Sequence, residues 1–287
     1  MRINHNISSM VTQGALSYIN RSTSKTLEKL STGLRINRAS DDAAGLSISE
    51  NLRTQVIGLG VAKRNAMDGI SLLQIAEGGL NEISSILQRM RELSVQSAND
   101  TLTSTERGYT NQEYDHLRSE IDRIVQTTLY NGQDLLTGVT GAGGSFGTAG
   151  SSSCILWVGP NSDTTNDVIK ISIDTMTTAS TGLNLTGTTL SSQGASLTSI
   201  ASLDAAINVV NAERSDLGAY INRLEHTINN IVNQEYNNQE AESTIRDADF
   251  AIETSNFTKW QILQQSATAM LSQANMVPQS VLSLLGR

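Results

Sequence analysis

Apolar residues recur at every seventh position in two long segments, one toward each end of the chain. A seven-residue repeat sustained over many turns is typical of helices that pack side by side in a left-handed supercoil. Such a stripe cannot be buried by its own helix, so each segment needs a partner. The rows are Leu52, Leu59, Ala66, Leu73, Leu80 and Leu87, and then Leu203, Val210, Leu217, Leu224 and Ile231. The sequence therefore predicts a mainly α fold built on a long antiparallel helical coiled-coil rod that the N- and C-terminal segments form together.

The composition suits a helical rod better than a compact globule. Aromatic residues make up only 4% of the chain, whereas Phe, Tyr and Trp normally supply much of a globular core. The two prolines, Pro160 and Pro278, leave the helical segments almost free of helix breakers. The net charge of −8 argues against nucleic acid or an anionic membrane surface as a partner. No apolar run reaches the roughly 20 residues of a membrane-spanning helix, so we expect no membrane insertion.

The N-terminal half reads as three helices. The first, within Ile3–Leu34, has weak helix propensity and should end near Gly33. We expect Ser40 to cap a second helix that continues to about Asn99. After a polar turn, a shorter helix should carry one apolar face, formed by Tyr114, Leu117, Ile121, Ile124 and Leu129.

The middle of the chain changes character, because Ser, Thr and Gly dominate residues 139–198. Two short runs there, Cys154–Val158 and Val168–Ile173, predict the strands of a small β-hairpin. We expect this hairpin to be exposed and tolerant of change.

Two more helices are predicted in the C-terminal part of the chain. One runs from about Ser199 to Glu242, and the other covers roughly Ile245–Leu285, with Ser243 or Thr244 as its cap. Pro278 predicts a kink or a local break in the latter. Its apolar stripe consists of Phe250, Phe257, Trp260, Leu263, Ala267, Met270, Ala274, Val277, Val281 and Leu284.

No pattern in the chain predicts catalysis, a cofactor or a metal site. The three histidines lie far apart, at His5, His116 and His226. Cys154 is the only cysteine, which excludes an intrachain disulfide and a cysteine-based zinc site. Gly143–Gly147 matches Gly-x-Ser-x-Gly, but no strand precedes it and no helix follows, as a nucleophile elbow requires. We therefore expect a protein that is not an enzyme, with no catalytic, cofactor-binding or metal-binding residues.

Several stretches of the chain match a family pattern. Met1–Asn6 reads MRINHN, Leu30–Asn37 reads LSTGLRIN, Ser40–Glu50 reads SDDAAGLSISE and Ala274–Leu285 reads ANMVPQSVLSLL. These stretches resemble the terminal regions of bacterial flagellins. The resemblance implies a structural subunit that is exported unfolded by the flagellar type III system and polymerises into the flagellar filament for motility.

The resemblance also implies a division of the chain. Residues 1–42 and 243–287 would form the inner filament core, 43–138 and 199–242 the coiled-coil rod, and 139–198 a short surface region with the hairpin. The apolar stripes of the terminal helices would then be contacts between copies. The residues expected there are Ile3, Ile7, Leu27, Leu30, Phe250, Phe257, Trp260, Leu263, Met270, Val277, Val281 and Leu284.

Partners and modifications follow from the same resemblance. The chain would bind copies of itself, an export chaperone, the filament cap and hook-junction proteins. A contact with host Toll-like receptor 5 is expected at Gln88, Arg89, Glu92, Leu93 and Glu113. O-linked sugars are expected at Ser151, Ser152, Ser153, Thr177 and Thr178.

Rival interpretations stay open at this point. A hook–filament junction protein shares the terminal helices, but that family usually has Pro after the Asp-Asp pair, where this chain has Ala43. A filament-displayed enzyme or adhesin is the rival from another class, and the His-Glu-x-x-His pattern of a displayed metalloprotease is absent. We expect an extracellular filament, with a periplasmic one, as in spirochetes, as the alternative.

Overall fold

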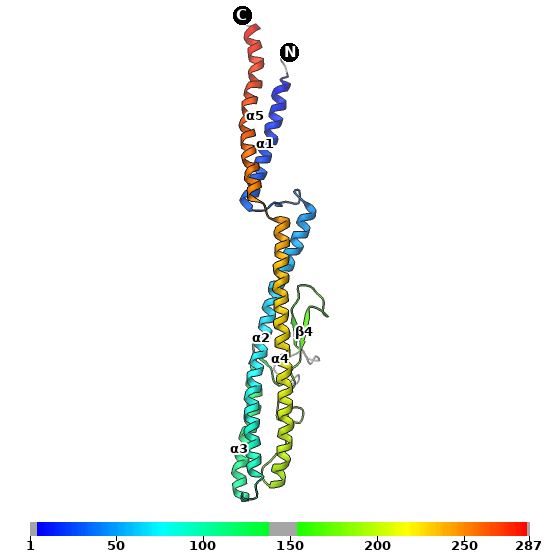
Figure 1. Ribbon diagram of the computed structural model, residues 1–287, viewed down its shortest axis with the longest axis vertical. Coiled ribbons are helices and arrows are strands. Elements are labelled where there is room, and N and C mark those ends of the chain that lie inside the picture. The colour runs from blue at the N-terminus through cyan, green and yellow to red at the C-terminus, as the bar shows by residue number, and fades with distance from the viewer. Residues whose placement is uncertain (1–4, 138–153, 286–287) are drawn as a thin grey trace. The chain divides into compact units, whose positions relative to one another are not determined.

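The computed structural model describes residues 5–137 and 154–285, with side chains as far as Met276 (Figure 1). The chain divides into two compact units. We call residues 1–56 and 236–287 the terminal unit, and residues 57–235 the rod unit. The three-part division implied by the family resemblance stays a prediction.

The rod unit is built from α3 (Ser104–Thr127) and from the larger parts of α2 (Ala43–Ser97) and α4 (Gln193–Arg246). The chain passes along α2 in one direction and returns along α3 and again along α4, so that α2 is antiparallel to both (Figure 1). The heptad rows are buried as predicted. The members of the two rows within the rod unit are at most 3% exposed: Leu59, Ala66, Leu73, Leu80, Leu87, Leu203, Val210, Leu217, Leu224 and Ile231.

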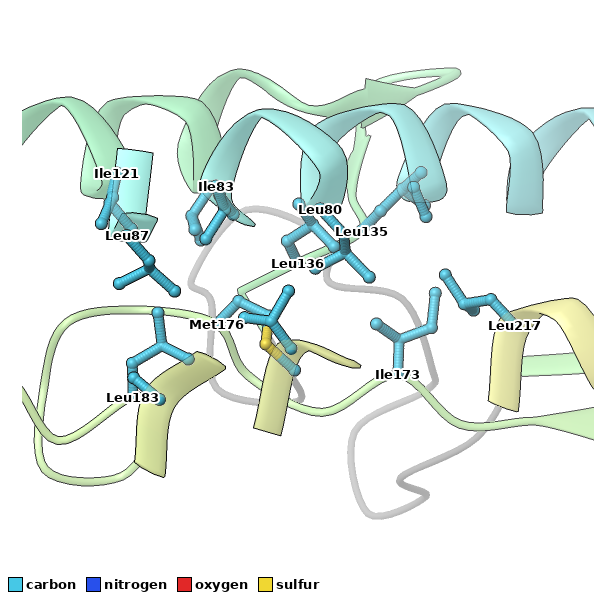
Figure 2. Packing of buried hydrophobic residues seen from close by; sticks show 14 of the residues in the cluster. Leu80, Ile83, Leu87, Ile121, Leu135, Leu136, Ile173, Met176, Leu183 and Leu217 are labelled. Atoms are coloured by element: carbon cyan, nitrogen blue, oxygen red, sulfur yellow. The ribbon is translucent and has the colours of Figure 1, made fainter. Parts of the chain in front are cut away.

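The core of the rod unit also contains residues from segments without regular structure. Figure 2 shows Leu135 and Leu136, from the segment after α3, beside Leu80 of α2, with Met176 and Leu183 on the facing side. These four residues are at most 3% exposed. The Ser/Thr-rich middle of the chain is therefore partly a core element.

Two small hairpins complete the rod unit. Strands β1 (Leu129–Tyr130) and β2 (Gln133–Asp134) pair around Asn131 and Gly132, whose φ angles of 49° and 78° form the tight turn. Strands β3 (Cys154–Trp157) and β4 (Val168–Ile171) pair antiparallel, which confirms the predicted hairpin.

Two expectations for this region were wrong. Leu129 belongs to β1 and is 45% exposed, so it is not part of the apolar face of α3. The hairpin is not an exposed patch, because Ile169 and Ile171 of β4 are 3% and 0% exposed in the core of the rod unit. The apolar residues of β4 are therefore part of the core of the rod unit, although the surrounding sequence is rich in Ser, Thr and Gly.

Polar side chains of α3 fix the segment after β4 to the rod. Asp122 accepts two hydrogen bonds from Thr178, one from the backbone N–H at 2.9 Å and one from Oγ1 at 2.7 Å. Two helical turns away, the hydroxyl of Tyr114 donates to Thr188 Oγ1 at 2.9 Å in the core. The two contacts lie on one broad side of α3, because positions eight residues apart differ by only about 80° around a helix.

We expect Asp122→Ala to lower the free energy of unfolding by about 1 to 3 kcal/mol, because the buried Thr178 groups would lose their acceptor. Urea denaturation of the monomer followed by circular dichroism measures the change. Glu120→Ala is the matched control on α3, since Glu120 pairs only at the surface with Arg123 and should change stability by less than about 1 kcal/mol. Equal effects of the two substitutions would contradict this role of Asp122.

A buried carboxylate lies on α4 where the segment after β4 crosses it. Glu213 is 7% exposed, and its Oε1 accepts the backbone N–H of Asp174 at 3.3 Å. Burial raises the pKa of Glu213, and the negative charges of Asp174 and Asp216 raise it further, against the opposing effect of that hydrogen bond. The folded state therefore holds the Glu213 proton more tightly than the unfolded chain does.

The consequence is a loss of stability as the pH rises. Below the ordinary pKa of a glutamate both states are protonated and Glu213 has no effect, whereas above the raised pKa of the folded state its buried charge destabilises the rod. We expect Glu213→Gln to raise the free energy of unfolding at pH 7 by on the order of 1 kcal/mol, the size typical of single substitutions. The gain should vanish near pH 4. A pH-independent difference in urea denaturation would argue against this cause.

The terminal unit contains α1 (Ile7–Thr32) and α5 (Phe250–Leu285), which lie side by side (Figure 1). Helix α1 ends as predicted, because Gly33 takes φ 72° and its N–H donates to Lys29 O at 2.9 Å. Next to this cap, Leu34 forms a β-bridge with Asp247 just before α5. This bridge holds the adjacent ends of α1 and α5 together.

Both predicted N-caps in the terminal unit were wrong by a few residues. Asp42 Oδ1 accepts the N–H of Gly45 at 2.9 Å at the start of α2, so Asp42 takes the role predicted for Ser40. At the start of α5, Asp249 Oδ1 accepts the N–H of Ala251 at 2.8 Å, in place of Ser243 or Thr244. Helix α5 continues through Pro278 to Leu285, without the local break that was one predicted outcome.

Candidate assembly surfaces

One face of α5 pairs with α1 of the same chain. The rings of Trp260 and Tyr18 meet edge to face, with centroids 6.1 Å apart and an interplanar angle of 79°. Lys29 Nζ of α1 contacts Glu253 Oε1 at 2.9 Å, and both side chains are largely buried. Trp260 lies seven residues after Glu253, so the two contacts follow one row of the helix. The pair therefore covers only one face of each helix.

The remaining faces of both helices expose large apolar side chains. On α1 they are Ile7, Met10, Val11 and Leu27, which are 53–66% exposed, and Tyr18 at the edge of the pair is 58% exposed although its ring contacts Trp260. On α5 they are Phe250, Ile252, Ile262, Leu263, Met270 and Met276, which are 37–60% exposed. Full burial of one such side chain stabilises a contact by about 1.5 to 3 kcal/mol. Because so many lie on one pair of helices, these surfaces are suited to extensive association.

The predicted assembly residues fall into three groups. Exposed on the unpaired faces are Ile7, Leu27, Phe250, Leu263 and Met270. Half-buried are Leu30, Phe257 and Trp260. Outside the described side chains are Ile3, Val277, Val281 and Leu284.

The sequence did not predict six of the exposed residues as assembly contacts. They are Met10, Val11, Tyr18, Ile252, Ile262 and Met276. The apolar stripe predicted for α5 combined two faces of the helix. The residues that pair with α1 recur at steps of three and four, and so do the residues that stay unpaired. The signal that could have found the missing residues is a second apolar row on each helix.

A charged patch lies on the rod unit where α2 faces α3. Arg89 donates to Glu113 Oε1 from Nε at 3.0 Å and from Nη2 at 2.9 Å, and to Glu92 Oε2 from Nη1 at 3.0 Å. Hydrogen bonds to Glu113 and then to Glu92 raise the pKa of the Arg89 guanidinium, which stays charged. Gln88 is also exposed, whereas Leu93 is 2% exposed in the core. Four of the five predicted receptor residues thus share a surface, and Leu93 supports it from within.

The predicted sugar-bearing residues differ in accessibility. Ser151, Ser152 and Ser153 lie outside the described residues. Thr177 is half-buried, and Thr178 is 8% exposed with its hydroxyl donated to Asp122. In the same stretch Ser180 and Thr181 are exposed.

The described residues contain no arrangement for metal chemistry. Residues 5–137 and 154–285 hold no group of three His, Cys, Asp or Glu side chains placed to bind a metal ion. Cys154 is half-buried in β3 opposite Ile171, and burial raises the pKa of its thiol. Gly143–Gly147 lies outside the described part of the chain. Within that part, no helix combines the length and the apolar character that crossing a membrane requires.

Comparisons with known proteins agree with the terminal motifs. Residues 3–140 match the bacterial flagellin N-terminal helical region, and residues 200–285 match the bacterial flagellin C-terminal helical region. Flagellin FlaB2 of Treponema pallidum is 45% identical, with 99% of this chain and all of that protein covered. A flagellin of Halalkalibacterium halodurans is also 45% identical, again over 99% of this chain and all of that protein.

A solved structure supports the architecture independently. A putative flagellar hook-associated protein from Vibrio parahaemolyticus has a TM-score of 0.59 over 72% of this chain and all of that chain, at 15% identity. That identity shows a shared fold alone, whereas the full-length relatives at 45% identity are flagellins. The two matched family regions, the full-length relatives and the helical rod together show that this chain belongs to the bacterial flagellins, the structural subunits of the flagellar filament.

Proposed function

We propose that the chain polymerises through the unpaired faces of α1 and α5, and that the resulting filament serves motility. The observation that supports this proposal is the exposure of large apolar side chains along both helices. Ile7 on α1 is 59% exposed, and Met270 on α5 is 60% exposed. A monomer that leaves so much apolar surface in water gains stability when another copy covers it. Residues 1–42 and 243–287 would then form the filament core, 43–138 and 199–242 the rod around it, and 139–198 part of its surface.

Export by the flagellar type III system is part of the same proposal, with an export chaperone, the filament cap and hook-junction proteins as partners. Weak intrinsic helix propensity in α1 supports it. Gly14, Asn20 and the many Ser and Thr residues of α1 favour a helix that is stable only when packed. A terminal helix of this kind is readily kept unfolded for transport and ordered on assembly.

Polymerisation of the purified monomer tests the proposal. Light scattering and electron microscopy should show long filaments for the full chain, and none for a control that lacks residues 245–287. If the full chain stays monomeric, or forms only short caps under all salting conditions, the proposal fails and the junction-protein alternative gains support.

We place the filament outside the cell, with a periplasmic filament as the alternative. Protease treatment of intact cells distinguishes them, because an outer membrane protects a periplasmic filament. Cleavage of the filament on intact cells supports the extracellular location, and cleavage only after disruption of the outer membrane contradicts it.

Recognition by Toll-like receptor 5 is a second proposed activity of the monomer. The exposed Gln88, Arg89, Glu92 and Glu113 form the surface that favours it. Monomeric protein should activate a receptor reporter cell line, and Arg89→Ala should reduce the response. Arg123→Ala is the matched control, because Arg123 is an exposed arginine of α3 that also pairs with a glutamate. A silent reporter with the parent monomer rejects the proposal.

O-linked sugars are proposed for the Ser/Thr-rich surface, at Ser151–Ser153 and in the stretch 177–181. Within this stretch the exposed Ser180 and Thr181 are better acceptors than Thr178, whose hydroxyl is engaged. An intact mass equal to the sequence mass, measured on protein from the native source, would remove this proposal.

A further inference from the structure

Helix α1 carries a glycine in the middle of its exposed apolar stripe. Ile7, Val11, Gly14 and Tyr18 follow one another at steps of four, three and four residues, which places them on one helix face. The three side chains are 59%, 66% and 58% exposed. A Cβ added to Gly14 would meet nothing within 4 Å. Gly14 is therefore an open gap in a row of large apolar side chains.

No contact within the described part of the chain accounts for glycine at this position. Glycine weakens a helix interior relative to alanine, and close approach of another chain segment is a common compensation. Gly58 and Gly79 follow this rule, since an added Cβ would lie 2.9 Å from Pro160 Cβ and 2.9 Å from Leu136 Cδ1, respectively. No described residue approaches Gly14 in this way. Gly78, Gly108, Gly194 and Gly218 are equally open, but Gly14 is flanked on its own face by the exposed large apolar side chains of Val11 and Tyr18. A contact with another molecule would account for a glycine in that setting.

We propose that Gly14 is a notch that receives a large apolar side chain from α5 of a second copy of this chain. The inference rests on the proposed polymerisation. A neighbouring face of α1 is already covered by α5 of the same chain, because Ile19 and Thr26 on that face are only 8% and 6% exposed. Each copy also presents large side chains on α5, such as Ile262 and Met270 at 58% and 60% exposure.

The geometry of helix packing favours this occupant. When helices pack lengthwise, a side chain of one helix inserts into a hole between residues of the other, and a small residue in that hole lets the helices approach closely. The notch on α1 and the side chain on α5 belong to different surfaces. A contact between different surfaces of identical copies is heterologous, and it extends into an open helical polymer when it does not close a ring.

The variant Gly14→Leu distinguishes two kinds of contact at this position. Either a side chain of another copy inserts into the gap, or the stripe packs as an even apolar surface. Leucine fills the gap in the stripe and favours helix formation, so a flat apolar contact would strengthen and the critical concentration for polymerisation would fall. A notch would instead be blocked, and we expect the critical concentration to rise at least tenfold. Circular dichroism should show unchanged or higher helix content in the monomer, which excludes misfolding as the cause.

Gly108→Leu is the matched control. Gly108 is an exposed glycine of α3 that also has nothing within 4 Å, but its helical neighbours Ser104, Thr105, Asn111 and Gln112 are polar. This variant should polymerise like the parent chain. If Gly14→Leu polymerises as well as the parent, the notch is refuted while the proposed function stands. If the parent forms no filaments, both fail. Impaired export with normal polymerisation in vitro would assign Gly14 to an export partner and also refute the notch.

Cross-linking identifies the helix that enters the notch. In a Cys154→Ser background, copies with Val11→Cys are mixed with copies with Ile262→Cys or Met270→Cys, polymerised and oxidised. Mass spectrometry should find disulfides between α1 of one copy and α5 of another at several times the level in unpolymerised controls. Disulfides only between two α1 helices would contradict the proposal.

Discussion

Replacing Leu263 and Met270 together by asparagine is expected to raise the critical concentration for filament formation by about two orders of magnitude. The two side chains are 37% and 60% exposed and lie seven residues apart on the unpaired side of α5. Each would lose about 1.5 kcal/mol of burial in the polymer, and each 1.4 kcal/mol corresponds to about a tenfold change in an equilibrium constant. Sedimentation of filaments at several protein concentrations measures the effect.

The monomer should be nearly unaffected by this double substitution, because the contacts of Trp260 and Glu253 with α1 stay intact. Gln265→Asn serves as the control, since Gln265 is an exposed polar residue of the same helix and its replacement adds the same side chain. Normal polymerisation of the double variant would exclude this face of α5 as a main assembly contact. Loss of polymerisation in the control would show that asparagine harms α5 for another reason.

The rod helices could be predicted from the sequence because one physical requirement determines them. An apolar row such as Leu59, Ala66 and Leu73 can be buried only if another helix runs alongside. The apolar residues of that partner helix then recur with the same period of seven. The hairpin around Trp157 and Val168 was equally readable, since two short β-prone runs flank a proline-containing turn. In both cases local pattern and tertiary contact favour the same structure.

The buried loop of the rod unit could not be predicted in this way. Met176 and Leu183 are single apolar residues within Ser/Thr-rich sequence, and nothing in their spacing reveals that both are buried in the core of the rod unit. Their burial depends on hydrogen bonds such as the pair between Asp122 and Thr178, which join positions 56 residues apart. Long-range polar contacts of this kind leave no periodic signal in one sequence.

The assembly surface was only half predictable for a related reason. Apolar rows on α5 indicate that the helix must be covered, but they do not show which residues α1 of the same chain covers. Trp260 and Leu263 are three positions apart in one predicted stripe, yet Trp260 packs on Tyr18 and Leu263 stays accessible. Only the packing of α1 against α5 in the structure shows which face of α5 is covered.

The second large effect is expected in the rod core, where Leu80→Ala should lower the free energy of unfolding by about 3 kcal/mol. Leu80 is 0% exposed and belongs to the buried cluster that residues of α2, α3 and α4 share, with Leu135 and Leu136 beside it (Figure 2). Truncation removes the transfer free energy of the lost atoms and leaves a cavity that the rigid helices cannot close. Urea denaturation of the monomer should show the loss as a lower midpoint with an unchanged slope.

Ile75→Ala on the same helix separates core packing from a general effect of alanine in α2. Ile75 is 42% exposed, so its truncation removes little buried surface and should change stability by less than about 1 kcal/mol. The same pair of variants also distinguishes an effect on folding of the rod unit from an effect on polymerisation. Because Leu80 is fully buried within the rod unit, Leu80→Ala should weaken polymerisation only in the temperature range in which the variant unfolds. A polymerisation defect at temperatures where the variant is fully folded would mean that Leu80 affects contacts between copies, which its complete burial in one chain argues against.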